Sequence, residues 1–140
     1  MTRVYITIDT EYSSGLVRTG SDEERADNFA RSIACVGSDG VAGVPHKLKM
    51  LEETGQSAVF FVDPMPALVW GVAAIEDVVG PILEADQNVQ LHLHTEWLQW
   101  AGANHPLASK RTGQNLFEFP YEEQLELLDF ARAHLIAAGA

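Results

Sequence analysis

The chain has 140 residues, of which 46% are apolar and 21% are charged, a composition typical of one folded soluble domain. Nine basic residues stand against twenty acidic ones, and the formal net charge of −11 disfavours binding to nucleic acid or to anionic membrane surfaces. The single cysteine, Cys35, excludes an intrachain disulfide and a cysteine-rich metal site.

The sequence contains no run of about 18 apolar residues, the length that a helix needs to cross a bilayer. The opening sequence MTRVYITIDTEY also lacks the basic end and the apolar stretch of a signal peptide. We therefore expect a cytoplasmic protein that does not associate with a membrane.

The amino-terminal part of the chain predicts a strand, a helix and a turn region. Residues 4–8 read VYITI, a β-branched and aromatic run that is typical of a strand covered on both faces in a parallel sheet. Ser21 and Glu24 match a capping box, which predicts a helix near 22–33. The glycines within 37–43 favour turns, and the residues after them do not match a phosphate-binding loop.

The middle of the chain predicts alternating helices and strands. Pro45 and Gly55 mark the start and the end of a short helix, and SAVFFV at 57–62 predicts a buried strand. Apolar residues then recur at helical spacing: Ile75, Val78, Val79, Ile82 and Leu83. Pro81 within this stripe predicts a kink or a break in the helix. NVQLHLH at 88–94 alternates as a third strand does.

The carboxyl-terminal part predicts a long loop over 101–114 and a last helix. Pro120 opens that helix, which runs to Gly139 through apolar residues at Leu125, Leu128 and Leu135. The order β, α, α, β, α, β, loop, α predicts an α/β fold with parallel β/α units. Binding residues of such a fold gather at the carboxyl ends of the strands.

Two pairs of metal-binding residue types lie at the ends of predicted strands. Asp9 and Glu11 come just past the first strand, and His92 and His94 lie at the end of the third. Residues two apart in extended backbone point to the same face, so each pair can direct two side chains to one point. Two imidazoles with one or two carboxylates are the usual donors of a catalytic zinc ion, so the sequence predicts a divalent metal site here.

The alternative interpretation of these residues is structural. The carboxylates would then form a solvated strand end, and the imidazoles would only satisfy backbone groups in a polar rim. Trp97 and Trp100 leave two interpretations open, because they could belong to the core or stack on sugar faces beside a polar site. The other reactive side chains are not expected to form the site. His46 and His134 fall on polar helix faces, and His105 lies in a loop. Cys35 is expected to be a small buried hydrophobic residue.

Three segments together carry a resemblance to a known family. TIDTE after the first strand, SAVFFV in the second and VQLHLHTEWL in the third resemble successive motifs of the polysaccharide deacetylase (NodB homology) superfamily, carbohydrate esterase family four. DTE combined with HLHTEW is similar to its divergent WalW-like branch. The resemblance runs through nearly all of residues 1–140 and implies the front part of a deformed (β/α) barrel. It also implies that the domain continues beyond this chain.

The family resemblance implies a metal-dependent hydrolase that removes acetyl groups from N-acetylated sugars or polysaccharides, usually with zinc. By position, Asp9 matches the family's catalytic-base aspartate, and His92 matches its first metal-binding histidine. The carbohydrate substrate is likewise implied by the resemblance.

This chain departs from the family pattern at two ligand positions. Thr10 replaces a metal-binding aspartate, and Glu96 stands where the second histidine is expected. Glu11 and His94 are the nearest substitutes by strand-face geometry, with Glu96 as an alternative third ligand.

Two other functions remain compatible with the sequence. A metal-dependent phosphoesterase also uses H-x-H at strand ends, but a phosphate substrate favours nearby cations, and the candidate loops contain only Arg18, Lys110 and Arg111. A noncatalytic carbohydrate-binding or assembly module fits the ligand departures. Whatever the function, a small sheet has open edges, and unpaired strand edges pair with other chains. We therefore expect that the protein forms a homo-oligomer through these edges.

Overall fold

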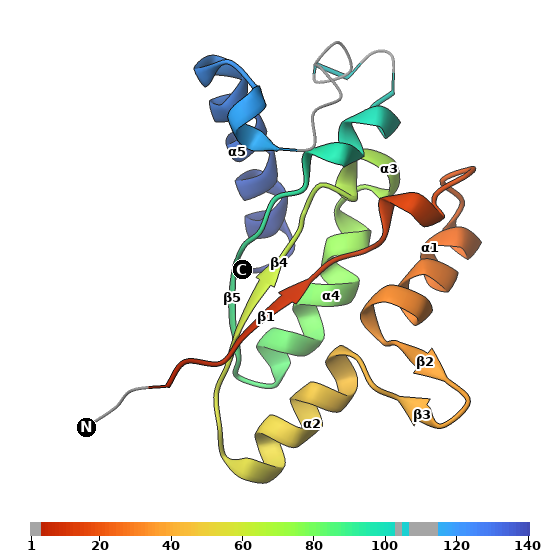
Figure 1. Ribbon diagram of the computed structural model, residues 1–140, viewed down its shortest axis with the longest axis vertical. Coiled ribbons are helices and arrows are strands. Elements are labelled where there is room, and N and C mark those ends of the chain that lie inside the picture. The colour runs from red at the N-terminus through yellow and green to blue at the C-terminus, as the bar shows by residue number, and fades with distance from the viewer. Residues whose placement is uncertain (1–3, 103–104, 107–114) are drawn as a thin grey trace.

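Three parallel strands form the centre of the computed structural model, which describes residues 4–102, 105–106 and 115–140. They lie side by side in the order β1-β4-β5 (Figure 1). Their bounds are β1 (Thr7–Thr10), β4 (Val59–Val62) and β5 (Asn88–Leu91). Both pairs are parallel, which confirms the predicted α/β class and its parallel sheet.

The described residues form five α-helices besides this sheet, and a small antiparallel hairpin lies apart from it. The helices are α1 (Asp22–Asn28), α2 (Val44–Thr54), α3 (Ala67–Trp70), α4 (Val72–Glu84) and α5 (Tyr121–Ala137), and the hairpin strands are β2 (Val36–Gly37) and β3 (Gly40–Val41). A π-helical turn, Phe29–Ile33, follows α1, and 3₁₀ turns occur at Ser14–Leu16, Thr95–Trp100 and Leu116–Glu118. Among the described residues, no helix combines the length and the apolar character needed to span a membrane.

Local sequence signals explain where three of the helices begin or end. The Ser21 hydroxyl accepts a hydrogen bond from the Glu24 N–H at 3.2 Å, as the capping box predicts for α1. Pro45 lies in the first turn of α2, and Gly55 ends that helix in the left-handed region at φ 63°. Pro120 directly precedes α5. These predicted boundaries are confirmed.

Helix α4 follows its predicted stripe, and of the kink or break predicted at Pro81 the break does not occur. Four residues of the stripe are buried, namely Ile75, Val78, Val79 and Ile82, whereas Leu83 is exposed. The helix continues through Pro81 to Glu84. Burial of Ile82, just beyond the proline, favours continuation of the helix over the loss of one backbone hydrogen bond.

The structure corrects several of the predicted element boundaries. The first strand runs from Thr7 to Thr10 and not over 4–8, because its register with β4 begins at Thr7, and Val4 is 83% exposed. Asp9, which was predicted to follow the strand, therefore lies within it. The third strand ends at Leu91, so both histidines follow it. The turn region contains the β2–β3 hairpin. Most of the loop predicted over 101–114 lies outside the described residues.

Helix α5 buries a different stripe from the predicted one. Leu127, Ala131 and Leu135 recur every four residues and face the core, whereas Leu125 is 39% exposed. The spacing of four places the first three residues on one face of a helix, and Leu125 falls outside that face. Only Leu135 of the predicted leucines therefore belongs to the buried face.

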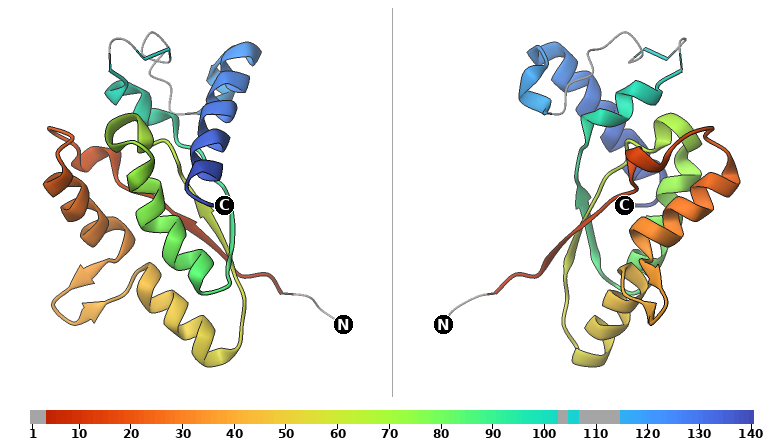
Figure 2. Two further views of the ribbon diagram at one scale, coloured as in Figure 1. Left: turned by 180° about the vertical axis from the view of Figure 1, so that it is seen from behind. Right: turned by 45° about the vertical axis from the view of Figure 1, so that its right-hand side comes forward.

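The sheet has two unlike faces. Helices α1, α4 and α5 lie on one side of it, in front of the strands when the molecule is seen from behind (Figure 2). We call this side the covered face; it contains Ile8, Thr10, Phe60, Val62, Val89 and Leu91. The opposite side, the open face, contains Thr7, Asp9, Val59, Phe61, Asn88 and Gln90. None of these six open-face residues is fully buried.

Candidate metal centre

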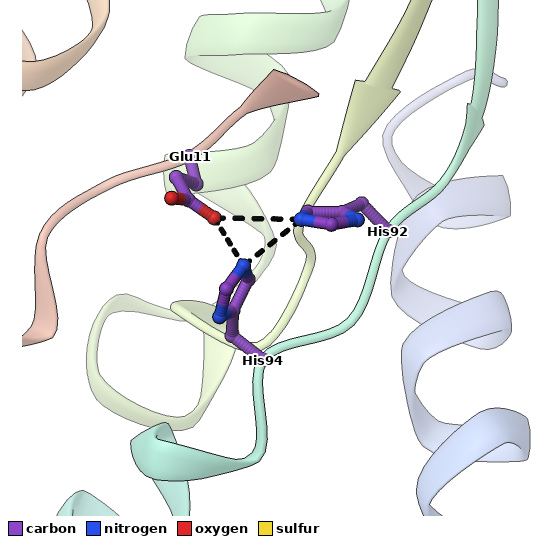
Figure 3. Close-up of side chains that lie close together, drawn as sticks. All are labelled: Glu11, His92 and His94. Atoms are coloured by element: carbon purple, nitrogen blue, oxygen red, sulfur yellow. Dashed lines mark hydrogen bonds and ion pairs between the residues drawn. The ribbon is translucent and has the colours of Figure 1, made fainter. Parts of the chain in front are cut away.

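The carboxyl edge of the sheet brings together the three residues predicted as metal ligands. Glu11 follows β1, and His92 and His94 follow β5, and the three side chains converge on one point (Figure 3). The Nε2 atoms of His92 and His94 are 2.9 Å apart. The Glu11 Oε2 atom lies 2.5 Å from Nε2 of His94 and 3.6 Å from Nε2 of His92.

The spacing of these three atoms fits a single transition-metal ion. One ligand atom from each residue lies within 4.8 Å of the other two. Ligands bound tetrahedrally about 2.0–2.1 Å from a zinc ion are themselves about 3.3 Å apart, which the observed separations bracket. The cluster could therefore hold a metal ion through two imidazole nitrogens and one carboxylate oxygen.

Glu96 supports His94 from the side that faces away from this cluster. Its Oε2 atom lies 3.2 Å from Nδ1 of His94. A hydrogen bond from Nδ1–H to this carboxylate would leave the Nε2 lone pair free for a metal ion, the usual arrangement behind a metal-binding histidine. The geometry therefore favours His94 as the ligand and gives Glu96 the outer position.

The charge around His94 changes its affinity for protons. Burial lowers the pKa of His94, but the neighbouring carboxylates of Glu11, Asp63 and Glu96 outweigh burial, and the pKa lies above its usual value. The same carboxylates that attract a proton also attract a metal cation. Proton and metal ion therefore compete for this imidazole.

Asp9 and Thr10 occupy opposite faces of β1. Asp9 is exposed on the open face, in register with Phe61, and alternation of side chains puts it on the same face as Glu11. It lies outside the cluster of three donors. Thr10 is buried on the covered face, and its hydroxyl donates to the Ile8 carbonyl. This orientation explains why Glu11, and not residue 10, reaches the centre.

Sequence reasoning missed Asp63, which lies at the end of β4 beside this centre. Its side chain is buried, with the residue only 1% exposed, and burial raises its pKa to about 7. Its Oδ1 atom accepts hydrogen bonds from the N–H groups of Met65 at 3.1 Å and His94 at 3.3 Å. The strand-end argument that singled out the other residues applies equally to VDP at 62–64 and could have found it.

A polar pocket adjoins the centre along β1. It encloses about 390 Å³, and it is lined by carboxylates, hydroxyls, a thiol and an ammonium group, among them Asp9, Glu11, Ser13, Ser14, Ser32, Cys35, Lys47 and Glu96. Asn28 fixes its wall, because its side chain accepts from the Ser13 N–H at 3.0 Å and donates to the Ser13 carbonyl at 2.8 Å. The Ser32 hydroxyl also donates to Asn28 at 3.0 Å.

The remaining candidate residues lie outside the cluster of three donors. Trp97 is 1% exposed and packs edge-on against Trp70 at 5.8 Å, so it belongs to the core, and Trp100 packs partly buried against that core. Cys35 is exposed, which corrects its assignment as a buried hydrophobe, and its φ of 49° is unusual for a residue with a side chain. The His134 ring stacks on Phe130 and bonds its carbonyl.

Comparison with known proteins adds no relative: no family model matches the sequence, and no curated protein or solved structure is significantly similar to it.

Proposed function

We propose that this protein is a metal-dependent hydrolase of the polysaccharide deacetylase type, which removes acetyl groups from N-acetylated sugars or polysaccharides. The convergence of Glu11, His92 and His94 at the carboxyl edge of a parallel sheet is the observation that carries the proposal. This arrangement agrees with the ligand substitutions inferred from the resemblance to the NodB homology superfamily. The β/α units would then be the front part of that family's deformed barrel.

The proposed chemistry assigns one task to each residue. Nε2 of His92, Nε2 of His94 and the Glu11 carboxylate would hold the ion, and Glu96 would keep the His94 ring in place. Zinc, when bound, supplies a Lewis acid that polarises the acetyl carbonyl and acidifies water. Asp9 takes the proton from the attacking water. Cleavage of the amide C–N bond then gives acetate and the free amino sugar.

The pocket beside the centre supports a carbohydrate as the substrate. The hydroxyls of Ser13 and Ser14 on its wall can donate and accept hydrogen bonds, as the hydroxyls of a sugar do, and the Ser32 hydroxyl, which donates to Asn28, can still accept one. Its volume of about 390 Å³ falls within the usual range for small-molecule sites. Asp9 and Glu11 line the same pocket, so a sugar in it would lie beside the proposed base and the metal centre.

A phosphoesterase is the second candidate, and Lys47 is the observation that favours it. Lys47 lines the pocket and could contact a phosphate group. Of the cations considered from the sequence, Arg18 instead donates to the carbonyl oxygens of Gly15 and Val17. Lys110 and Arg111 lie outside the described residues.

Metal titration followed by two hydrolysis assays tests the proposal. We expect the chelator-treated protein to bind one zinc ion and to release acetate from N-acetylated chito-oligosaccharides, with no phosphate released from p-nitrophenyl phosphate. Asp9→Asn should abolish hydrolysis while the metal content stays intact, because it removes the proposed base and not a ligand. Glu11→Gln should instead weaken zinc binding.

Three results would count against this assignment. Failure of the wild-type protein to bind zinc would reject the metal centre. Phosphate release without acetate release would favour the phosphoesterase. Reversed phenotypes of the two variants would make Asp9 the ligand and Glu11 the base.

A further inference from the structure

The hydrogen-bond ladder between β4 and β5 ends in an unusual way. In a pair of parallel strands, the N–H groups of every second residue of one strand donate to the carbonyls of every second residue of the other. The Asn88 N–H donates to the Ala58 carbonyl at 3.3 Å, and the His92 N–H donates to the Val62 carbonyl at 3.0 Å. The next bond in this series would join the His94 N–H to the carbonyl of Pro64.

Pro64 does not accept that bond, because the chain turns away from the sheet at this point. Its carbonyl accepts from the Ala67 N–H at 3.1 Å, at the turn that leads into α3. The His94 N–H donates to the side chain of Asp63 instead, to Oδ1 at 3.3 Å. The carboxylate thus takes the place that a backbone carbonyl has in the rest of the ladder.

The same oxygen also holds the turn that departs from the sheet. Oδ1 of Asp63 accepts from the Met65 N–H at 3.1 Å, an i to i+2 bond typical of an aspartate turn. The Asp63 N–H donates to the Thr10 carbonyl at 3.1 Å, which ties the residue to β1 as well. Asp63 therefore connects all three strand ends from which the metal centre is built.

The burial of Asp63 requires a reason beyond packing. Its Oδ2 atom is buried and has no hydrogen-bond partner in the structure. A buried carboxylate oxygen without a partner costs free energy, whereas an apolar residue at this position would not. The hydrogen bonds that Oδ1 accepts from Met65 and His94 give a reason for an aspartate at this position.

We propose that Asp63 is a positioning residue of the metal centre: its Oδ1 atom replaces the missing Pro64 carbonyl and fixes the backbone of His94, so that the His94 ring reaches Glu11 on one side and Glu96 on the other. The proposal rests on the metal centre proposed above, but it concerns how the ligand is held and not which reaction follows.

Two substitutions at this position separate placement from charge. Asp63→Ala removes the acceptor, and we expect zinc affinity to fall about 10–100-fold, the usual effect of losing a residue that orients a metal ligand. Asp63→Asn keeps an acceptor oxygen but removes the charge, so its zinc affinity should fall clearly less than that of Asp63→Ala. The ligand-field spectrum of bound cobalt(II) should change in the alanine variant alone.

Gln87 provides a matched control at the opposite end of the same two strands. Its side-chain Oε1 atom accepts from the Ala58 N–H at 2.8 Å, so it also ties the segment before β5 to the segment before β4. Gln87→Ala should lower the free energy of unfolding, because it removes a hydrogen bond between two segments. It should leave zinc affinity and the cobalt spectrum unchanged. A general loss of stability would not distinguish the two ends of the sheet.

Amide hydrogen exchange gives a readout that needs no metal. The His94 amide should be protected in the wild type and in Asp63→Asn, and it should exchange faster in Asp63→Ala. The proposal is overturned if Asp63→Ala binds zinc as the wild type does, or if Asp63→Asn is as weak as Asp63→Ala, because charge would then be the cause. Failure of the wild type to bind zinc, with His94 protection as expected, would refute the proposed metal centre and leave the backbone role of Asp63 intact.

Discussion

The two faces of the three-stranded sheet differ more than their shared backbone suggests. On the covered face Phe60 is fully buried beneath the helices, whereas its neighbour Phe61 is only half-buried on the open face, in a row with Asp9 and Gln90. The period of two residues along a strand allows this separation. The same strands thus stabilise the fold with one set of side chains and place partly or fully exposed side chains, Asp9 among them, on the other face. Substitutions on the two faces should therefore have different consequences.

Adjacent phenylalanines give the most direct test of this contrast. Phe60→Ala should lower the free energy of unfolding by about 4 kcal/mol, because it leaves a cavity in the core. Phe61→Ala should lower it less, by about 2 kcal/mol, because its side chain is already partly exposed to water. Urea unfolding followed by circular dichroism measures both. Equal losses in the two variants would show that the open face is covered in solution.

Two histidines extend the contrast from stability to metal binding. His92→Ala should reduce zinc affinity by on the order of 100-fold, about 2.7 kcal/mol, because it removes a proposed ligand. His134→Ala is the control: this ring stacks on Phe130 in α5 and bonds its carbonyl, away from the three donors. Its zinc affinity should match the wild type in a competition assay with a chromophoric chelator. A similar loss in both variants would mean that the zinc is bound elsewhere.

Asp63 makes the free energy of unfolding depend on pH in the metal-free protein. Burial raises its pKa to about 7, whereas an unfolded aspartate has a pKa of about 4. Between these values the folded state holds a proton that the unfolded state has released, so stability decreases as the pH rises. The raised pKa of His94 acts in the same direction, because stability from the protonated imidazole is lost as the pH rises through its folded pKa.

We expect a loss on the order of 2 kcal/mol between pH 5 and pH 8, with chelator present, and a smaller loss in Asp63→Asn. Unfolding by urea at several pH values measures it. A wild-type protein that becomes more stable over this range would contradict the assignment of a protonated, buried Asp63.

The sequence predicted the three strands of the sheet, helices α1, α2, α4 and α5 and the three proposed ligands, because these follow from local patterns. It did not predict α3 or the β2–β3 hairpin. The three ligands could be predicted because the carboxyl ends of parallel strands lie at the same edge of a sheet. Glu11, His92 and His94 lie at or near the ends of two such strands. The start of β1 could not be predicted in this way. Val4 and Tyr5 have strand propensity, but a strand also needs a partner, and β4 pairs only from Thr7 onward.

Long-range packing accounts for most of what the sequence did not predict. Continuation of α4 through Pro81 depends on the burial of Ile82, and burial is a property of the whole fold. The role of Asp63 depends on a ladder bond from His94, 31 residues away. Lys47 was expected only as part of a helix, and its place on the pocket wall follows from how α2 meets β1.

Gly43 limits how the pocket could change during evolution. A Cβ atom at this position would lie 2.0 Å from the Ile33 carbonyl oxygen, so glycine alone fits between the π-helical turn and the start of α2. Two segments of the pocket wall, which include Ser32 on one side and Lys47 on the other, are therefore joined by main chain in direct contact. A side chain at position 43 would push these two segments apart and shift the main chain of the pocket wall. A lineage acquiring a new substrate would have to alter the side chains that line the wall.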